Sequence, residues 1–214
     1  MNPLVIAATM ARRGMLAPNL PHRLVGQLTS LATWGMSLVG EVRQAALGAP
    51  QRIAVIDQAR GATTYAELFD RGMRAAVALR SQGVEPGHRI GLMARNHVGA
   101  VEVMVGASAL GVDLVLVNTG LAGEQLGLVL AQQEIDLLVH DEEFAAIVDV
   151  LVDGPKTLSE SAFAAAVDAL PVGTSVDRPE PAGRTIILTS GTTGVPKGAA
   201  SPVSRSVATT TRGR

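Results

Sequence analysis

Short apolar runs alternate with amphipathic stretches along the middle of the chain. The apolar runs predict strands at 53–56, 89–93, 112–117, 136–140 and 184–189, and the run 112–117 is rich in β-branched residues. The stretches between them carry apolar residues at intervals of three or four and predict helices at about 64–83, 96–111, 122–131, 142–151 and 161–170. This repeat predicts an α/β fold, with a mostly parallel sheet covered by helices on both faces.

Local signals at the helix ends support this reading. Thr64 can cap a helix whose third residue, Glu67, can reach back to the Thr64 backbone, and Gly83 is suited to end that helix. Asn96 is the expected cap of the next helix, which runs to Gly111.

An amphipathic helix is predicted to precede the sheet, over residues 19–46. Its apolar positions recur on one face: Leu24, Leu28, Leu31, Leu38 and Val42. Two interpretations stay open. The helix packs on the main domain, or it presents that face to a membrane or a partner protein.

Composition narrows the classes of function. With 47% hydrophobic and 17% charged residues the chain can build a packed core. Only 2% of the residues are aromatic, which argues against stacking on single-stranded nucleic acid, so no nucleic-acid partner is expected. There is no Cys, and no two of the four His stand at a metal-ligand spacing, so no metal site is expected.

The charges are unevenly distributed. Residues 96–155 carry ten acidic side chains and no Lys or Arg, whereas residues 1–95 are rich in Arg. The basic first part could approach an anionic membrane surface. Because no signal peptide or spanning segment is evident, a cytoplasmic protein is expected, with peripheral contact at the inner face of the membrane through residues 19–46 as the alternative.

The segment 185–198 carries the clearest chemistry. A buried strand leads into a run of hydroxyls and glycines that ends in one lysine, Lys197. Glycines let successive backbone N–H groups converge on an anion, hydroxyls donate to phosphate oxygens, and the ammonium adds a full positive charge. The spacing fits neither the P-loop nor the dinucleotide-binding fingerprint. The alternative is a Ser/Thr/Gly surface turn.

These residues resemble the phosphate-binding signature of the adenylate-forming, or AMP-binding, superfamily. The match is Thr189-Ser-Gly-Thr-Thr-Gly-Val-Pro-Lys-Gly198, and it extends upstream to Thr64-Tyr-Ala-Glu-Leu68, to Gly87–Asn96 and to Leu110–Asn118. It covers roughly residues 50–198. The chain most resembles bacterial fatty-acyl-CoA ligases.

The resemblance implies a two-step reaction. A carboxylate, here of a fatty acid, attacks the α-phosphate of ATP, with Mg²⁺, to give an acyl-adenylate, and the thiol of coenzyme A then displaces AMP. It also implies a set of residues that bind the β- and γ-phosphates: Thr189, Ser190, Gly191, Thr192, Thr193, Gly194 and Lys197. The nucleotide is thus the expected partner, and the fatty acid is expected for the full-length family.

Much of the family pattern has no counterpart in this sequence. Tyr65 is its only tyrosine, so the Tyr-Gly-x-Thr-Glu motif is missing, and no lysine is left for the acyl carboxylate. We therefore expect a truncated acyl-CoA ligase without catalytic residues of its own, inactive alone. Its expected division is a helical segment 1–49, a partial α/β domain 50–198 and a disordered tail 199–214. The alternative is a non-catalytic nucleotide-binding or membrane-surface module, or a degenerate gene product.

Overall fold

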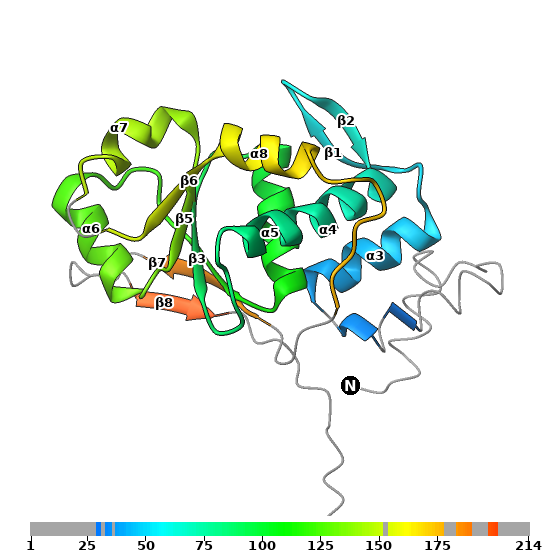
Figure 1. Ribbon diagram of the computed structural model, residues 1–214, viewed down its shortest axis with the longest axis horizontal. Helices are drawn as coiled ribbons and strands as arrows, with labels where there is room; N and C mark the ends of the chain where they lie inside the picture. The colour runs from blue at the N-terminus through cyan, green and yellow to red at the C-terminus, as the bar shows by residue number, and fades with distance from the viewer. Residues whose placement is uncertain are drawn as a thin grey trace, which may run out of the picture.

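Strands and helices alternate along the computed structural model, which describes residues 29–30, 33–35, 37–151, 154–177, 183–189 and 197–200 (Figure 1). The strands are β1 (Ile53–Asp57), β2 (Gly61–Thr64), β3 (Arg89–Met93), β4 (Asp113–Leu116), β5 (Leu137–His140), β6 (Lys156–Ser159), β7 (Thr185–Thr189) and β8 (Lys197–Ala200). The helices are α3 (Leu38–Gly48), α4 (Tyr65–Ser81), α5 (Val98–Leu110), α6 (Gly123–Gln132), the 3₁₀ turn η1 (Glu142–Phe144), α7 (Ala145–Val148) and α8 (Glu160–Asp168).

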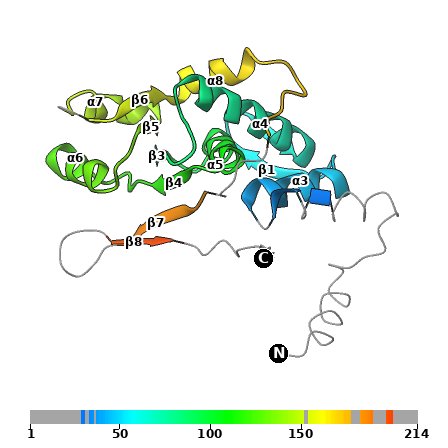
Figure 2. The same ribbon diagram turned by 60° about the horizontal axis from the view of Figure 1, so that its bottom comes forward.

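Six of these strands form one sheet in the order β6-β5-β3-β4-β7-β8. The first five run parallel, and β8 pairs antiparallel with β7 at one edge (Figure 2). The predicted parallel α/β sheet is therefore confirmed. A separate antiparallel hairpin of β1 and β2 precedes it, and the sequence pattern predicted only its first strand.

The central strands are buried on both faces because their side chains alternate between two cores. On β3, Ile90 belongs to one core cluster and Met93 to the other. On β5, Leu137 and Leu138 divide in the same way. This explains why these strands read as continuous apolar runs in the sequence.

Helices cover both faces, as predicted. The first core contains side chains from α3, α4, α5 and α8, whereas the second contains side chains from α6, η1 and α7 (Figure 1). The α5 connection leads from β3 to β4, and the α6 connection leads back across β3 to β5. The two crossovers run in opposite directions along the sheet and cover opposite faces. Both therefore have the same hand, as parallel βαβ units require.

Helix α4 begins with the predicted capping box. The Thr64 hydroxyl accepts a hydrogen bond from the Glu67 backbone N–H at 3.3 Å, and the Glu67 carboxylate accepts one from the Thr64 backbone N–H at 2.8 Å. Beyond the other end, Gly83 has a φ of 90°, the left-handed conformation expected after a helix.

The predicted cap of α5 is wrong by one residue. His97, and not Asn96, is the N-cap, because its ring Nδ1 accepts a hydrogen bond from the Ala100 backbone N–H at 3.3 Å. The helix ends at Gly111 as predicted, with φ at 69°. An imidazole nitrogen can replace the usual oxygen acceptor, and the sequence preference for Asn concealed this.

The prediction of one continuous helix over residues 19–46 is also wrong. Gly35 lies in a turn with a φ of 62°, and Ser37 starts α3 anew by accepting a hydrogen bond from the Gly40 backbone N–H. Helix α3 buries Val39 and Val42 against the first core, so this part packs on the domain. Residues 19–28 lie outside the described part.

Two further boundaries differ from the sequence prediction. The predicted helix 142–151 is shorter, with η1 and α7 spanning 142–148. Phe144 and Val148 are buried in the second core, and Ile147 and Leu151 pack against it while partly exposed. Strand β8 runs through the predicted boundary between residues 198 and 199, while residues 201–214 lie outside the described part. The division into 1–49, 50–198 and 199–214 stays a prediction. Among the described residues, no helix is both long and apolar enough to span a membrane.

Candidate functional site

The segment predicted to bind phosphate joins β7 to β8 at the carboxyl end of the parallel sheet. Thr189 is the last residue of β7 and Lys197 the first of β8, and the two are Cα partners in the antiparallel register. For both residues the backbone alone is described. The other predicted contacts lie outside the described residues: Ser190, Gly191, Thr192, Thr193 and Gly194.

The strand register shows which loops lie beside this segment. Leu116 of β4 pairs with Leu92 of β3 on one side and with Ile187 of β7 on the other. Leu92 in turn pairs with Val139 of β5. The loops that follow β5, β3, β4 and β7 therefore leave the sheet in one row. In open α/β sheets, ligands bind at this end of the strands.

Asp141 ties the loops after β5 and β3 together. Its Oδ2 accepts a hydrogen bond from the Arg95 backbone N–H at 2.6 Å, and its Oδ1 lies 2.8 Å from Nε2 of His97. Because Nδ1 of His97 already accepts from Ala100, Nε2 is the nitrogen that donates to Asp141. Both ring nitrogens are thus engaged, and His97 acts as a structural brace.

Arg95 reaches across the same end of the sheet. Its Nε and Nη2 donate to the two carboxylate oxygens of Glu143 at 2.9 and 2.8 Å, and its Nη1 lies 3.4 Å from Oγ1 of Thr119, in the loop after β4. The guanidinium stands 5.1 Å from the centroid of the Phe144 ring. This hydrogen bonding lowers the pKa of Glu143 and raises the pKa of Arg95.

The β1–β2 hairpin is attached beside these loops through Asp57. One carboxylate oxygen accepts hydrogen bonds from the Ala59 and Arg60 backbone N–H groups, and the other accepts from the Val98 N–H at 2.9 Å. These bonds, that from Val98 first, lower the pKa of Asp57. A carboxylate at the start of α5 is favoured by the helix dipole.

A buried ionic cluster joins α5 to α4, to α8 and to the turn of the β1–β2 hairpin. Glu102 of α5 is fully buried, and its Oε1 accepts from Nε of Arg71 at 2.6 Å and from Nη2 of Arg60 at 2.9 Å. Arg71 also donates to Asp168 of α8 at 2.7 Å. Burial lowers the pKa of Arg71, but the bonds to Glu102 and Asp168 outweigh it and raise that pKa.

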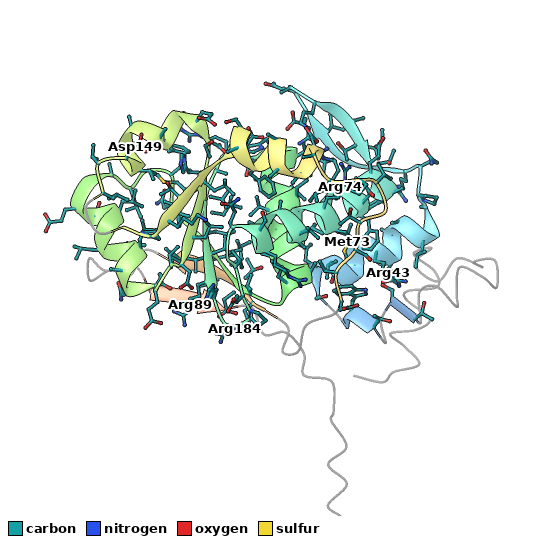
Figure 3. The ribbon with its side chains drawn as sticks, in the orientation of Figure 1. Arg43, Met73, Arg74, Arg89, Asp149 and Arg184 are labelled. Atoms are coloured by element: carbon teal, nitrogen blue, oxygen red, sulfur yellow. The ribbon has the colours of Figure 1, made fainter. Side chains whose placement is uncertain are left out.

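A second ionic cluster lies at the amino end of the sheet, away from the candidate site. Asp113 of β4 accepts from the Arg184 backbone N–H at 2.9 Å and from its Nη2 at 2.6 Å. Nε of Arg89 lies 4.0 Å from the same carboxylate, and Figure 3 shows the two arginines side by side. This cluster aligns β7 with its neighbours.

A shallow groove of about 320 Å³ lies between α6 and the segment after α7. Its lining is mostly small or apolar: Gly123, Glu124, Gly127, Leu128, Val150 and Leu151. Within the described ranges, no three His, Asp or Glu side chains are placed to hold a metal ion.

The sequence pattern does not indicate the hydrogen-bonded cluster formed by Arg95, His97, Asp141 and Glu143. A usable signal existed, since Asp141 comes directly after the predicted strand 136–140 and Arg95 comes two residues after the predicted strand 89–93. What the pattern could not give was the pairing of β3 with β5, because β4 lies between them in sequence.

Comparison with known proteins gives consistent matches. The family model described as "AMP-binding enzyme" matches residues 42–213. The chain is 33% identical over 172 residues to 2-succinylbenzoate–CoA ligase of Geobacillus kaustophilus, covering 80% of this chain and 32% of the relative. It is 29% identical to a long-chain-fatty-acid–CoA ligase of Thermus thermophilus, covering 64% of this chain and 27% of the relative. It therefore spans about a third or less of these curated relatives.

Solved structures share the fold. The inhibitor-bound N-terminal domain of FACL13 from Mycobacterium tuberculosis superposes with a TM-score of 0.70 at 24% identity, covering 77% of this chain and 44% of that chain. The complex of VinN with 3-methylaspartate gives a TM-score of 0.69 at 27% identity, covering 80% of this chain and 48% of that chain.

Proposed function

The chain belongs to the AMP-binding enzyme family, and from this membership we propose that it binds the outer phosphates of ATP through the segment that joins β7 to β8. The proposal rests on one observation above all. The signature Thr189–Gly198 starts and ends on two paired strands at the carboxyl end of the sheet. A Ser/Thr/Gly surface turn with no binding role would not need to lie at the carboxyl end of the parallel sheet, so this position favours the phosphate-binding interpretation.

The residue types suit the β- and γ-phosphates. Hydroxyls of Thr189, Ser190, Thr192 and Thr193 can donate hydrogen bonds, and Gly191 and Gly194 let backbone N–H groups approach the phosphate oxygens. Lys197 adds a positive charge at the start of β8. Pairing of Thr189 with Lys197 fixes the two ends of this phosphate-binding segment relative to each other.

Holding the outer phosphates prepares ATP for attack at the α-phosphorus. We propose that a carboxylate oxygen forms the new bond to that phosphorus while the bond to the bridging oxygen of pyrophosphate breaks. The phosphate-binding segment would position the leaving pyrophosphate and compensate its charge, with Mg²⁺ accompanying the polyphosphate. The thiol of coenzyme A would then attack the acyl carbonyl and release AMP.

For the acid, we propose a fatty acid. Support comes from a relative named long-chain-fatty-acid–CoA ligase in Thermus thermophilus and one named medium/long-chain-fatty-acid–CoA/3-oxocholest-4-en-26-oate–CoA ligase in Mycobacterium tuberculosis. Other relatives bear the names of ligases for 2-succinylbenzoate and for ferulate. The class of carboxylate therefore rests on likeness alone, whereas nucleotide binding rests on residues of this chain.

The sequence offers a matched experiment, because Lys156 and Lys197 are its only lysines. Lys156 starts β6 at the amino end of the sheet, where its Nζ donates to the Gln82 carbonyl at 2.9 Å. We expect Lys197→Ala to weaken ATP binding by about tenfold or more in calorimetric titration, while Lys156→Ala leaves it unchanged. Inorganic pyrophosphate should compete with ATP. Equal binding by both variants would refute the proposal.

A further inference from the structure

The loop after β3 carries a cation that the proposed function has not used. Arg95 shares its guanidinium between Glu143 and Thr119, as described above. The side chain of Arg95 is 59% exposed and that of Glu143 is 49% exposed. An exposed ion pair of this kind contributes little to stability, so its partners can be exchanged at low cost.

Arg95 lies just beyond β3, two strands from β7, whose last residue, Thr189, begins the phosphate-binding segment. The pairs Leu92–Leu116 and Leu116–Ile187 place the ends of β3, β4 and β7 in one row, with Arg95 and Thr189 just beyond. Two strand spacings separate β3 from β7, which is about 10 Å. The guanidinium lies between Glu143, which follows β5, and Thr119, in the loop after β4, where Nη1 is 3.4 Å from Oγ1.

The carboxyl end of the sheet carries several negative charges, which a bound polyphosphate would increase unless a cation lies nearby. The loop and turn after β5 present three carboxylates, on Asp141, Glu142 and Glu143. Among the described residues of the loops directly after β3, β4 and β5, Arg95 is the one Lys or Arg. A polyphosphate held beside these acids would be repelled unless Arg95 offset them.

The carboxylate of Glu143 binds the guanidinium of Arg95 in the same geometry that a phosphate would use. Its two oxygens accept from two guanidinium nitrogens at once, the fork geometry that carboxylates and phosphates share. Phe144 stands beneath the guanidinium and would keep it at the same position after Glu143 leaves.

We propose that Arg95 is a second cationic contact for the outer phosphates of ATP, and that a phosphate oxygen pair displaces Glu143 from its guanidinium. This inference rests on the proposed function, since it uses the same nucleotide. It adds a residue outside the Thr189–Gly198 signature, and it assigns Glu143 the role of a competitor that occupies the cation in the free protein.

If Glu143 competes with phosphate for Arg95, substitutions of the two residues should change nucleotide affinity in opposite directions. Arg95→Ala should weaken binding of ATP and of tripolyphosphate to the full chain by roughly tenfold, because a charged hydrogen-bond donor is lost. Glu143→Ala should tighten both by about two- to threefold, because the competitor is removed. Arg80→Ala and Glu85→Ala repeat the charge changes as controls, because both residues are exposed and lie between the last turn of α4 and the amino end of β3. Circular dichroism and thermal melting check that each variant is folded.

Each outcome decides between the two proposals. If Arg95→Ala binds ATP like the wild type, or if Glu143→Ala weakens binding, Arg95 is a structural residue and the inference is wrong. If Lys197→Ala still weakens ATP binding in that case, the proposed function stands. If the wild-type chain binds neither ATP nor tripolyphosphate, both proposals fall.

Discussion

Asp113 and Arg184 join β4 to β7 through three hydrogen bonds. The carboxylate of Asp113 accepts from the Arg184 backbone N–H at 2.9 Å, from Nε at 3.3 Å and from Nη2 at 2.6 Å. Arg184 directly precedes β7, so this contact sets where β7 begins along β4. Since β7 carries Thr189 at its other end, the same contact fixes the position of Thr189, the first residue of the phosphate-binding segment, along β4.

This contact predicts acid sensitivity. Burial raises the pKa of Asp113, but the hydrogen bonds and charge of Arg184 outweigh it, so the pKa in the folded protein lies below the unfolded value. A lowered carboxyl pKa stabilises the fold above the unfolded pKa of about 3.9, and this stabilisation is lost as the pH falls through the folded pKa. We expect Asp113→Asn to lower stability at neutral pH and to flatten its decline between about pH 5 and pH 2. Urea unfolding at several pH values measures this, and a parallel decline in both proteins would contradict it.

Close packing of α4 on α5 predicts a second effect. A Cβ at Gly106 would lie 2.9 Å from Cβ of Ala75 and 3.0 Å from the Ala76 backbone nitrogen. Gly106→Ala should therefore destabilise the fold by about 1–3 kcal/mol. Gly127→Ala in α6 is the matched control, because its Cβ would meet Leu151 at an ordinary 3.7 Å. The control should gain about 0.5–1 kcal/mol through helix propensity. Chemical denaturation of both variants checks the difference in sign.

The buried ion cluster gives a third prediction. Glu102 is fully buried, while its neighbour in the cluster, Asp168, has a side chain that is 63% exposed. Glu102→Ala leaves Arg71 without its main partner and should cost about 3 kcal/mol or more. Asp168→Ala removes an exposed partner of the same arginine and should cost less than about 1 kcal/mol. Similar losses in the free energy of unfolding for the two variants would show that burial does not govern this cluster.

Local sequence signals predicted the elements better than their relations in space. The capping box of Thr64 and Glu67 lies within four residues, and the sequence identified it in full. The contacts of Asp141 with Arg95 and His97 depend on a strand order in which β5 returns beside β3, and no local pattern encodes that order.

The same distinction between local signals and long-range contacts applies to the residues of the candidate site. The sequence predicts Thr189 and Lys197 as phosphate contacts because the signature is contiguous in the chain, and this stays a prediction. The sequence marks Arg95 only as part of the stretch Gly87–Asn96 that resembles the family, since its contacts with Glu143 and Thr119 span 48 and 24 residues. The helix over 19–46 was overextended because apolar periodicity continues through Gly35, where the backbone turns.

The placement of the two lysines at opposite ends of one sheet gives the molecule a built-in reference for chemical footprinting. An acylating reagent that modifies side-chain amines reports on β6 and β8 in a single mass spectrum, with Lys156 as the internal standard. Protection of Lys197 by a bound nucleotide could then be followed as a ratio within each molecule, without any correction for reagent decay or protein concentration.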